Sequence, residues 1–190
     1  MSALDGPLVF VDVETTGLSP AYNRVIEVAA IRVEKGQIVG SMNQLLDPEQ
    51  AEELPAFITE LTGIRPKDLR DAPTFSLVAK ELETLLDGAL FVAHNSRFDY
   101  AFLREEFKRA GINFGPQQLC TMRLSRALFP EERSHKLENI IYRHGFVTER
   151  RHRAYDDAEV LWKFLNHLQT AFEPEVLLKA LSKQLTGSYA

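Results

Sequence analysis

The chain has 190 residues, of which 45% are hydrophobic, and it carries a formal net charge of −5 at pH 7. This length and composition fit one globular domain with a sizeable core, and the negative charge argues against a surface that coats nucleic acid broadly. The sequence shows no apolar run of membrane-spanning length and no signal-peptide pattern, and its single cysteine, Cys120, excludes an internal disulfide network. We therefore expect a cytoplasmic protein without a membrane segment.

Charge is distributed unevenly along the chain. Residues 97–153 contain 12 Lys and Arg against 7 Asp and Glu, whereas residues 1–96 contain 7 against 15. The central segment could therefore hold a phosphate backbone. Ordinary solvated helix faces would give the same pattern, and the sequence leaves both interpretations open.

The first predicted element is the apolar, β-branched run at residues 8–13, which is typical of a strand buried on both faces. Asp12 and Glu14 lie two residues apart near its end, and side chains two apart on a strand point to the same face. Neighbouring carboxylates repel each other, more strongly in a low dielectric, and a divalent ion such as Mg²⁺ would relieve the repulsion. Two solvated acids before a turn are the simpler interpretation.

Two more strands are predicted at residues 25–33 and 37–46, joined by a tight turn at Gly36. Together with the first strand they indicate an antiparallel meander. A short helix at residues 55–63 should end at Gly63, and apolar residues at helical spacing predict an amphipathic helix over 74–86.

A short apolar strand is predicted at residues 89–93, and a helix ending near Gly111 should follow it, with Asn95 or Ser96 as its N-cap. Asp99 would lie in the first turn of that helix, where the helix dipole stabilises an acid in any case. If this strand runs parallel to the first one, both strands end at the same edge of the sheet, where sites form in α/β proteins.

The last third of the chain should contain an edge strand at residues 118–122 and helices around 137–144 and 158–168. Asp157 lies on the buried stripe of the last of these helices, where an aspartate without a partner would be costly, and a metal ion is one such partner. His152 should lie on the loop that enters this helix, and an imidazole there could act as a general base or simply be a surface residue. Strands first and mixed elements later indicate a mixed sheet covered by helices.

Three motifs closely resemble those of the DEDDh exonucleases, the DnaQ-like group typified by the proofreading epsilon subunit of bacterial replicative DNA polymerase. In chain order they are Asp12-x-Glu14-Thr15-Thr16-Gly17, His94-Asn95-x-x-Phe98-Asp99 and His152-x-Ala154-x-x-Asp157. The tyrosine subgroup of this superfamily has Tyr four residues before the last Asp. This chain has Arg153 there, so the histidine subgroup fits.

The resemblance implies a ribonuclease H-like α/β fold, with a mixed five-stranded sheet flanked by helices, and an exonuclease domain over residues 1–172. Residues 173–190 would be a helix or linker that leads to a further domain in a longer protein.

The resemblance also implies 3′-to-5′ exonuclease activity that depends on two Mg²⁺ or Mn²⁺ ions. The ions would be held by Asp12, Glu14, Asp99 and Asp157, and His152 would deprotonate the attacking water, a division of work that suits two-metal hydrolysis. Leu61 would be an apolar wedge. The residues expected to line the substrate are Val13, Thr15, Thr16, Gly17, Leu18, Leu61, His94, Asn95, Ser96 and Phe98.

The substrate and partner stay open at this point. A single-stranded or frayed 3′ end of DNA is the first expectation, with RNA or short oligonucleotides as the alternative and a polymerase or a fused domain as the partner. A haloacid-dehalogenase-type phosphatase is a remote alternative, because Asp12 begins a similar motif, but Glu14 replaces its second Asp and no partner lysine is evident. An inactive nucleic-acid-binding module is another, although all five catalytic candidates are present.

Overall fold

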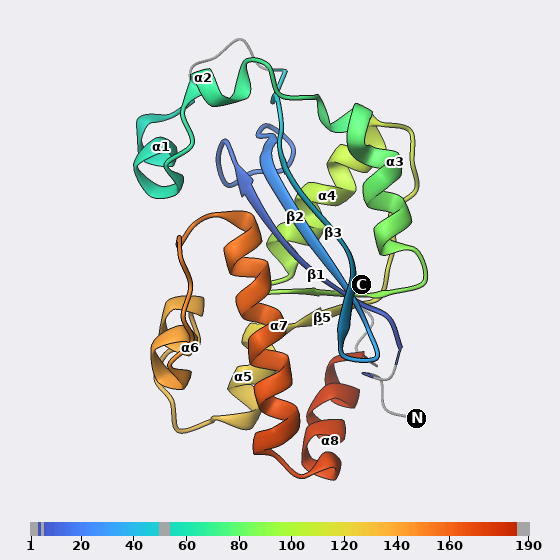
Figure 1. Ribbon diagram of the computed structural model, residues 1–190, viewed down its shortest axis with the longest axis vertical. Coiled ribbons are helices and arrows are strands. Elements are labelled where there is room, and N and C mark those ends of the chain that lie inside the picture. The colour runs from blue at the N-terminus through green and yellow to red at the C-terminus, as the bar shows by residue number, and fades with distance from the viewer. Residues whose placement is uncertain (1–3, 5, 50–53, 186–190) are drawn as a thin grey trace.

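The computed structural model describes residue 4, residues 6–49 and residues 54–185. Its strands form one five-stranded sheet in the order β3-β2-β1-β4-β5, with β1 in the centre (Figure 1). The first three strands form the expected antiparallel meander, and the last two run parallel to β1. The strands are β1 (Leu8–Thr15), β2 (Val25–Glu34), β3 (Gln37–Leu45), β4 (Leu90–Ala93) and β5 (Gln118–Cys120).

Helices of the described residues cover both faces of the sheet. They are α1 (Ala56–Thr62), α2 (Pro66–Leu69), α3 (Phe75–Leu86), α4 (Arg97–Arg109), α5 (Thr121–Leu128), α6 (Leu137–His144), α7 (Ala154–Ala171) and α8 (Pro174–Leu185). The expected edge strand at 118–122 was too long, because Thr121 and the residue after it form the first turn of α5. The sequence analysis missed this helix altogether, since its buried residues follow the strand without a turn signal.

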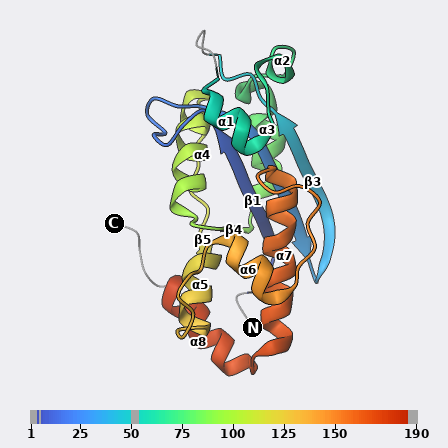
Figure 2. The ribbon, with the colours of Figure 1, turned by 90° about the vertical axis from the view of Figure 1, so that its left-hand side faces the viewer.

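Alternate side chains of β1 point into the two hydrophobic cores on opposite faces of the sheet. Leu8 and Phe10 belong to the core beneath α5, α6, α7 and α8, whereas Val9 and Val11 belong to the core beneath α3 and α4. Figure 2 shows these two layers on opposite sides of the sheet. Asp12 and Glu14 continue the first series, so they lie on the face that α7 covers.

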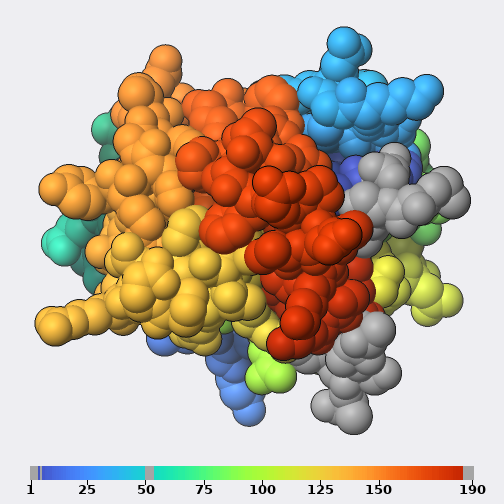
Figure 3. Space-filling view, turned by 90° about the horizontal axis from the view of Figure 1, so that it is seen from below, coloured from blue at the N-terminus to red at the C-terminus, as the bar shows by residue number. Residues whose placement is uncertain are grey.

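The helix expected after residue 173 is present as α8, and Leu181 on it is fully buried. Seen from below in Figure 3, α8 (red) lies against α5 (gold) and α7 (orange). The predicted linker at residues 186–190 lies outside the described residues, and the division of the chain at residue 172 stays a prediction. Cys120 is a free thiol in the core, and none of the described helices is long and apolar enough to cross a membrane.

Candidate active site

The carboxyl end of β1 is where the predicted acids come together. β4 pairs with residues 8–10 of β1, so no part of β4 pairs with β1 beyond Phe10. The first turn of α4 takes the place of β4 there, and the backbone N–H of Val13 donates to Oδ1 of Asp99 at 3.2 Å. The parallel pairing of β1 and β4 thus brings Asp99 beside Asp12 and Glu14.

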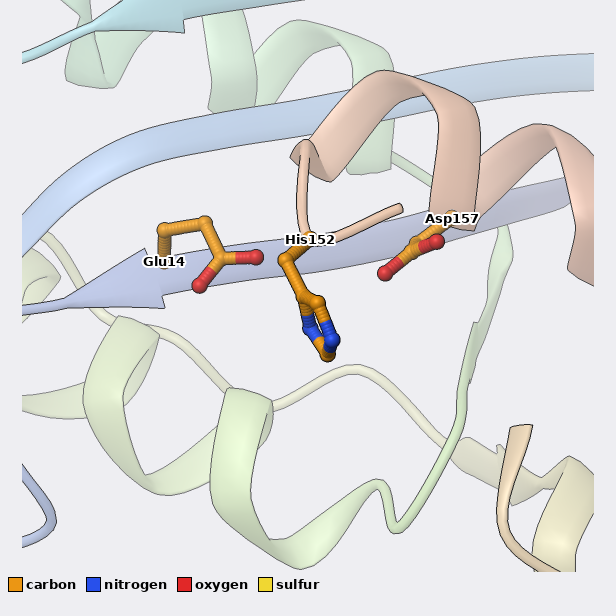
Figure 4. A group of neighbouring side chains, drawn as sticks. All are labelled: Glu14, His152 and Asp157. Atoms are coloured by element: carbon orange, nitrogen blue, oxygen red, sulfur yellow. The ribbon is translucent and has the colours of Figure 1, made fainter. Parts of the chain in front are cut away.

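The fourth acid comes from α7, which crosses the same face of the sheet. Glu14, His152 and Asp157 each offer a ligand atom, and these three atoms lie within 4.8 Å of one another (Figure 4). His152 lies on the loop just before Ala154, the first residue of α7, as expected. Its backbone has a φ of 58°, which is uncommon for a residue other than glycine.

These carboxyl groups resist ionisation. Burial raises the pKa of Asp12 well above its usual range, and the negative charges of Asp99, Asp157 and Glu14 raise it further. Burial and neighbouring acids raise the pKa of Glu14 to about 8. Burial also raises the pKa of Asp99 to about 8, although backbone N–H groups, including that of Val13, act in the opposite direction. The site therefore has more negative charge than its surroundings balance.

Within the described part of the chain, Arg151 supplies an opposing charge that acts on several of these acids. Its Nη1 donates to Oδ1 of Asp157, and its charge lowers the pKa of Asp12, Glu14 and Asp157. A single guanidinium cannot neutralise four carboxylates. The oxygen-rich set that remains suits hard divalent ions such as Mg²⁺ or Mn²⁺, so the residues present fit the metal that the sequence predicted.

The loop between β1 and β2 is shaped by its own polar groups. The hydroxyl of Thr15 donates to the carbonyl of Gly17 at 2.6 Å, and the hydroxyl of Thr16 accepts the N–H of Arg24 at 3.0 Å. A Cβ at Gly17 would lie 2.6 Å from Oδ1 of Asn23, so a larger residue there would displace the Asn23 side chain, which accepts the N–H of Ser19. Both threonine side chains are buried inside the loop.

The predicted apolar contacts are exposed beside the site. Leu18 is 84% exposed on the β1–β2 loop, and Leu61 is 49% exposed on α1. Ile58 fixes α1 to Ile26 of β2 in a small core, which leaves Leu61 and Phe57 on the outer face of the helix. A surface that offers such side chains could contact bases.

The other predicted contact residues lie around the start of α4. Asn95 is exposed with a φ of 57°, and Phe98 packs on Phe102 within its own helix. Nδ1 of His94 lies 2.9 Å from the hydroxyl of Thr121, and burial lowers the pKa of His94 to about 4. These groups border the site without entering the cluster of acids.

The predicted N-cap position of α4 is confirmed, but it lacks a side-chain cap hydrogen bond. Ser96 occupies the N-cap position, but its hydroxyl donates to Oε1 of Gln118 at 2.9 Å and makes no cap hydrogen bond. A partner on β5 therefore outcompetes the local backbone. Val13, another predicted contact, is buried, and its N–H is already used by Asp99.

The sequence analysis assigned no contact at the site to three residues: Arg151, Arg153 and Glu27. Glu27 stands opposite Glu14 on β2, and its buried carboxylate binds Arg153. The available signal was a charged residue inside the otherwise apolar run of β2, since a buried acid needs a partner. The sequence could not tell which of the arginines that partner is.

The family model RNase_T, described as an exonuclease, matches residues 9–165. The chain belongs to this exonuclease family. The match covers all four acids and His152, and the phosphatase alternative has no support from it. What the family shares is a metal-dependent hydrolase domain, which agrees with the set of acids at the end of β1.

Curated relatives are similar over most of this exonuclease domain. It is 40% identical over 154 residues to a 3′-5′ exonuclease DinG of Bacillus subtilis, a match that covers 80% of the chain but 16% of the relative. It is 36% identical over 167 residues to a DNA polymerase III PolC-type of Halalkalibacterium halodurans, covering 85% of the chain and 12% of the relative. The chain thus spans a small part of these much longer proteins.

Solved structures share the fold. A structure of E. coli exonuclease I with a dA16 oligonucleotide aligns with a TM-score of 0.78 at 22% identity, covering 90% of this chain and 42% of that one. A structure described as suggesting how exonuclease I achieves processivity aligns with a TM-score of 0.79 at 23% identity, over 90% of this chain and 42% of that one. The expected ribonuclease H-like α/β fold is confirmed.

Proposed function

We propose that this domain is a 3′-to-5′ exonuclease that removes nucleoside monophosphates from single-stranded or frayed 3′ ends of DNA. The observation that carries the proposal is the meeting of Asp12, Glu14, Asp99 and Asp157 with His152 at one end of β1. The name of the DinG relative and the oligonucleotides bound to exonuclease I support the direction and the substrate.

The four acids would hold two Mg²⁺ or Mn²⁺ ions. Such ions, when bound, activate the attacking water and stabilise the leaving oxygen. His152 would take the proton of that water, a role supported by the closeness of its ring to the carboxyl groups of Glu14 and Asp157 (Figure 4). The exposed side chains of Leu18 and Leu61 would contact the last base of the strand.

The basic segment at residues 97–153 supports only part of this picture. Seven of its cations form ion pairs with acids: Lys108, Arg109, Lys136, Arg143, Arg150, Arg151 and Arg153. The excess of positive charge in this segment would steer the phosphate backbone toward the site. A polymerase partner, suggested by the PolC-type relative, and a cytoplasmic location are further predictions.

The proposal is tested with matched DNA and RNA strands labelled at either end. With Mg²⁺ or Mn²⁺, we expect a 5′-labelled DNA strand to shorten stepwise and a 3′-labelled strand to release a labelled mononucleotide at once. Unpaired ends should react faster than paired ends, because unpairing a base costs a few kcal/mol. Faster degradation of RNA would assign the alternative substrate, and nicking of a closed circle at a comparable rate would contradict the proposal.

A further inference from the structure

A buried ion pair joins β2 to the residue that precedes α7. The side chain of Glu27 is 1% exposed, and both of its carboxylate oxygens accept from the guanidinium of Arg153 at 2.6–3.1 Å. The same carboxylate accepts the backbone N–H of Ala154, the first residue of α7, at 3.0 Å. Glu27 thus holds this junction through a side chain and through the backbone.

The contact with Ala154 satisfies a general need of helices. The first N–H groups of a helix have no partner inside it, and the side chain of Arg153, at the N-cap position, supplies none. Glu27 provides an acceptor from the neighbouring strand, and its negative charge lies at the positive end of the helix dipole. The first turn of α7 therefore begins at a point that the sheet fixes.

The positions of two residues of the candidate site, His152 and Asp157, depend on this start of α7. His152 directly precedes Arg153 and has the unfavourable φ of 58°, which its surroundings must maintain. The N–H of Asp157 donates to the carbonyl of Arg153 at 3.1 Å in the first turn of α7. Glu27 also stands opposite Glu14 across the β1–β2 pair. One ion pair thus connects β2, the strand beside the one that carries Glu14, with the segment that carries His152 and Asp157.

We propose that Glu27 and Arg153 are positioning residues, which orient His152 and hold Asp157 at the correct distance from Glu14. The proposal rests on the exonuclease function proposed above and adds residues that touch neither metal nor substrate. Groups that orient the residues of a metal site typically contribute about 10- to 100-fold in activity or metal affinity. An ion pair with a purely structural role would affect stability alone.

A set of four variants separates the two roles. Arg153→Met leaves Glu27 buried without a counter-charge, which should destabilise the fold. The double variant Glu27→Met/Arg153→Met fills the same space with apolar groups, an exchange that is often neutral for stability. Arg153→Lys keeps the charge but loses the two-pronged contact. The matched control is Arg32→Met on the same strand, because Arg32 pairs with Glu34 at 2.8 Å and donates to the carbonyl of Leu85 on the other face of the sheet.

The decisive experiment measures kcat and the thermal midpoint of unfolding for each variant and compares the two changes. We expect Arg153→Met and the double variant to lose about 10- to 100-fold in kcat, with only the double variant recovering the thermal midpoint. Arg153→Lys should recover part of the rate, and Arg32→Met should lower the midpoint with kcat unchanged. Recovery of both kcat and midpoint in the double variant, or a normal kcat in Arg153→Met, would overturn the proposal.

Two further measurements do not depend on activity. The imidazole NMR resonances of His152 and the affinity for Mn²⁺ should both change in the double variant. If wild-type protein cleaved no nucleic acid, the proposed function would fail, while these two measurements would still decide on the ion pair. Unchanged resonances and unchanged Mn²⁺ affinity in the double variant would overturn the positioning role.

Discussion

Two groups of buried acids in this domain differ in how their charge is balanced. Glu27 and Glu106 have side chains that are 1% exposed, and each binds an arginine, Arg153 at 2.6 Å and Arg24 at 2.8 Å. Each also accepts a backbone N–H, from Ala154 and Val25 respectively. These buried acids are paired with partly buried arginines and connect elements that are distant in sequence.

The acids at the end of β1 are arranged in the opposite way. Asp12, Glu14, Asp99 and Asp157 face one another, and Arg151 is the cation that contacts one of them. The difference shows that burial of an acid does not by itself indicate a site, since a paired acid is also buried. A shortage of cations around several buried acids indicates it, because such acids must either stay protonated or bind a cation.

The largest effect should come from removing one of the uncompensated acids. Asp12→Ala should abolish exonuclease activity, while the metal-free protein keeps its fold or becomes more stable, because one source of repulsion is gone. Activity assays and thermal unfolding in chelator would measure the two effects. A large loss of stability in the metal-free variant would place Asp12 with the structural acids, and full activity of the wild type after exhaustive chelation would refute the metal site.

Removing the predicted general base should have the next largest effect. His152→Ala should lower kcat by about 10²- to 10⁴-fold, the usual contribution of a general base, with Mn²⁺ binding little changed. The dependence of kcat on pH should differ between the wild type and the variant, because the variant lacks the group that would accept the proton of the water. A variant with the wild-type rate and pH profile would show that His152 only occupies the entrance to α7.

Removing a compensated acid should affect stability instead. Glu106→Ala leaves Arg24 with only the exposed Glu49 as partner and leaves the N–H of Val25 without its acceptor. We expect a loss of about 3 kcal/mol in the free energy of unfolding, at the lower end of the range for a broken buried pair. Urea titrations with Mg²⁺ and with chelator should give the same loss. A loss that disappears when metal is added would mean that Glu106 communicates with the site.

The sequence was enough to predict the acids of the candidate site, but not the ion pairs of the other buried acids. The period of two placed Asp12 and Glu14 on one face, and the order of strands and helices was enough to predict the mixed sheet, because both depend on local patterns. The pairing of Glu27 with Arg153 spans 126 residues and follows from tertiary structure alone. The same holds for the hydroxyl of Ser96, which bonds to Gln118 instead of capping its own helix. Local rules therefore found the acids of the site but not the ion pairs beside them.

The acids at the end of β1 should also make the stability of the protein depend on pH. The pKa values of Glu14 and Asp99 are raised to about 8 in the folded protein, above their usual values near 4. Their contribution to the stability of metal-free protein is therefore fully present below about pH 4 and is lost as the pH rises through about 8.

This dependence is measured as the thermal midpoint in chelator between pH 5.5 and pH 9, which should fall across the range. Added Mg²⁺ should raise the midpoint most at high pH, because metal binds the deprotonated acids. The Asp12→Ala variant is the control and should show a weaker fall. A midpoint of metal-free protein that rises steadily from pH 5.5 to pH 9 would contradict the pKa shifts.

The smallest effect should come from Arg151, which partly balances the site and so competes with metal. The arginine side chain of its ion pair with Asp157 is 27% exposed, and because solvent screens this side of the pair, we expect it to contribute about 1 kcal/mol. Arg151→Ala should therefore lower the Kd for Mn²⁺ by no more than about fivefold and slightly destabilise the metal-free protein. The matched control is Arg150→Ala, because Arg150 is 64% exposed and lies 4.0 Å from Asp156. Titration calorimetry with Mn²⁺ measures both variants, and weaker binding in Arg151→Ala would mean that this arginine orders the site instead of competing for it.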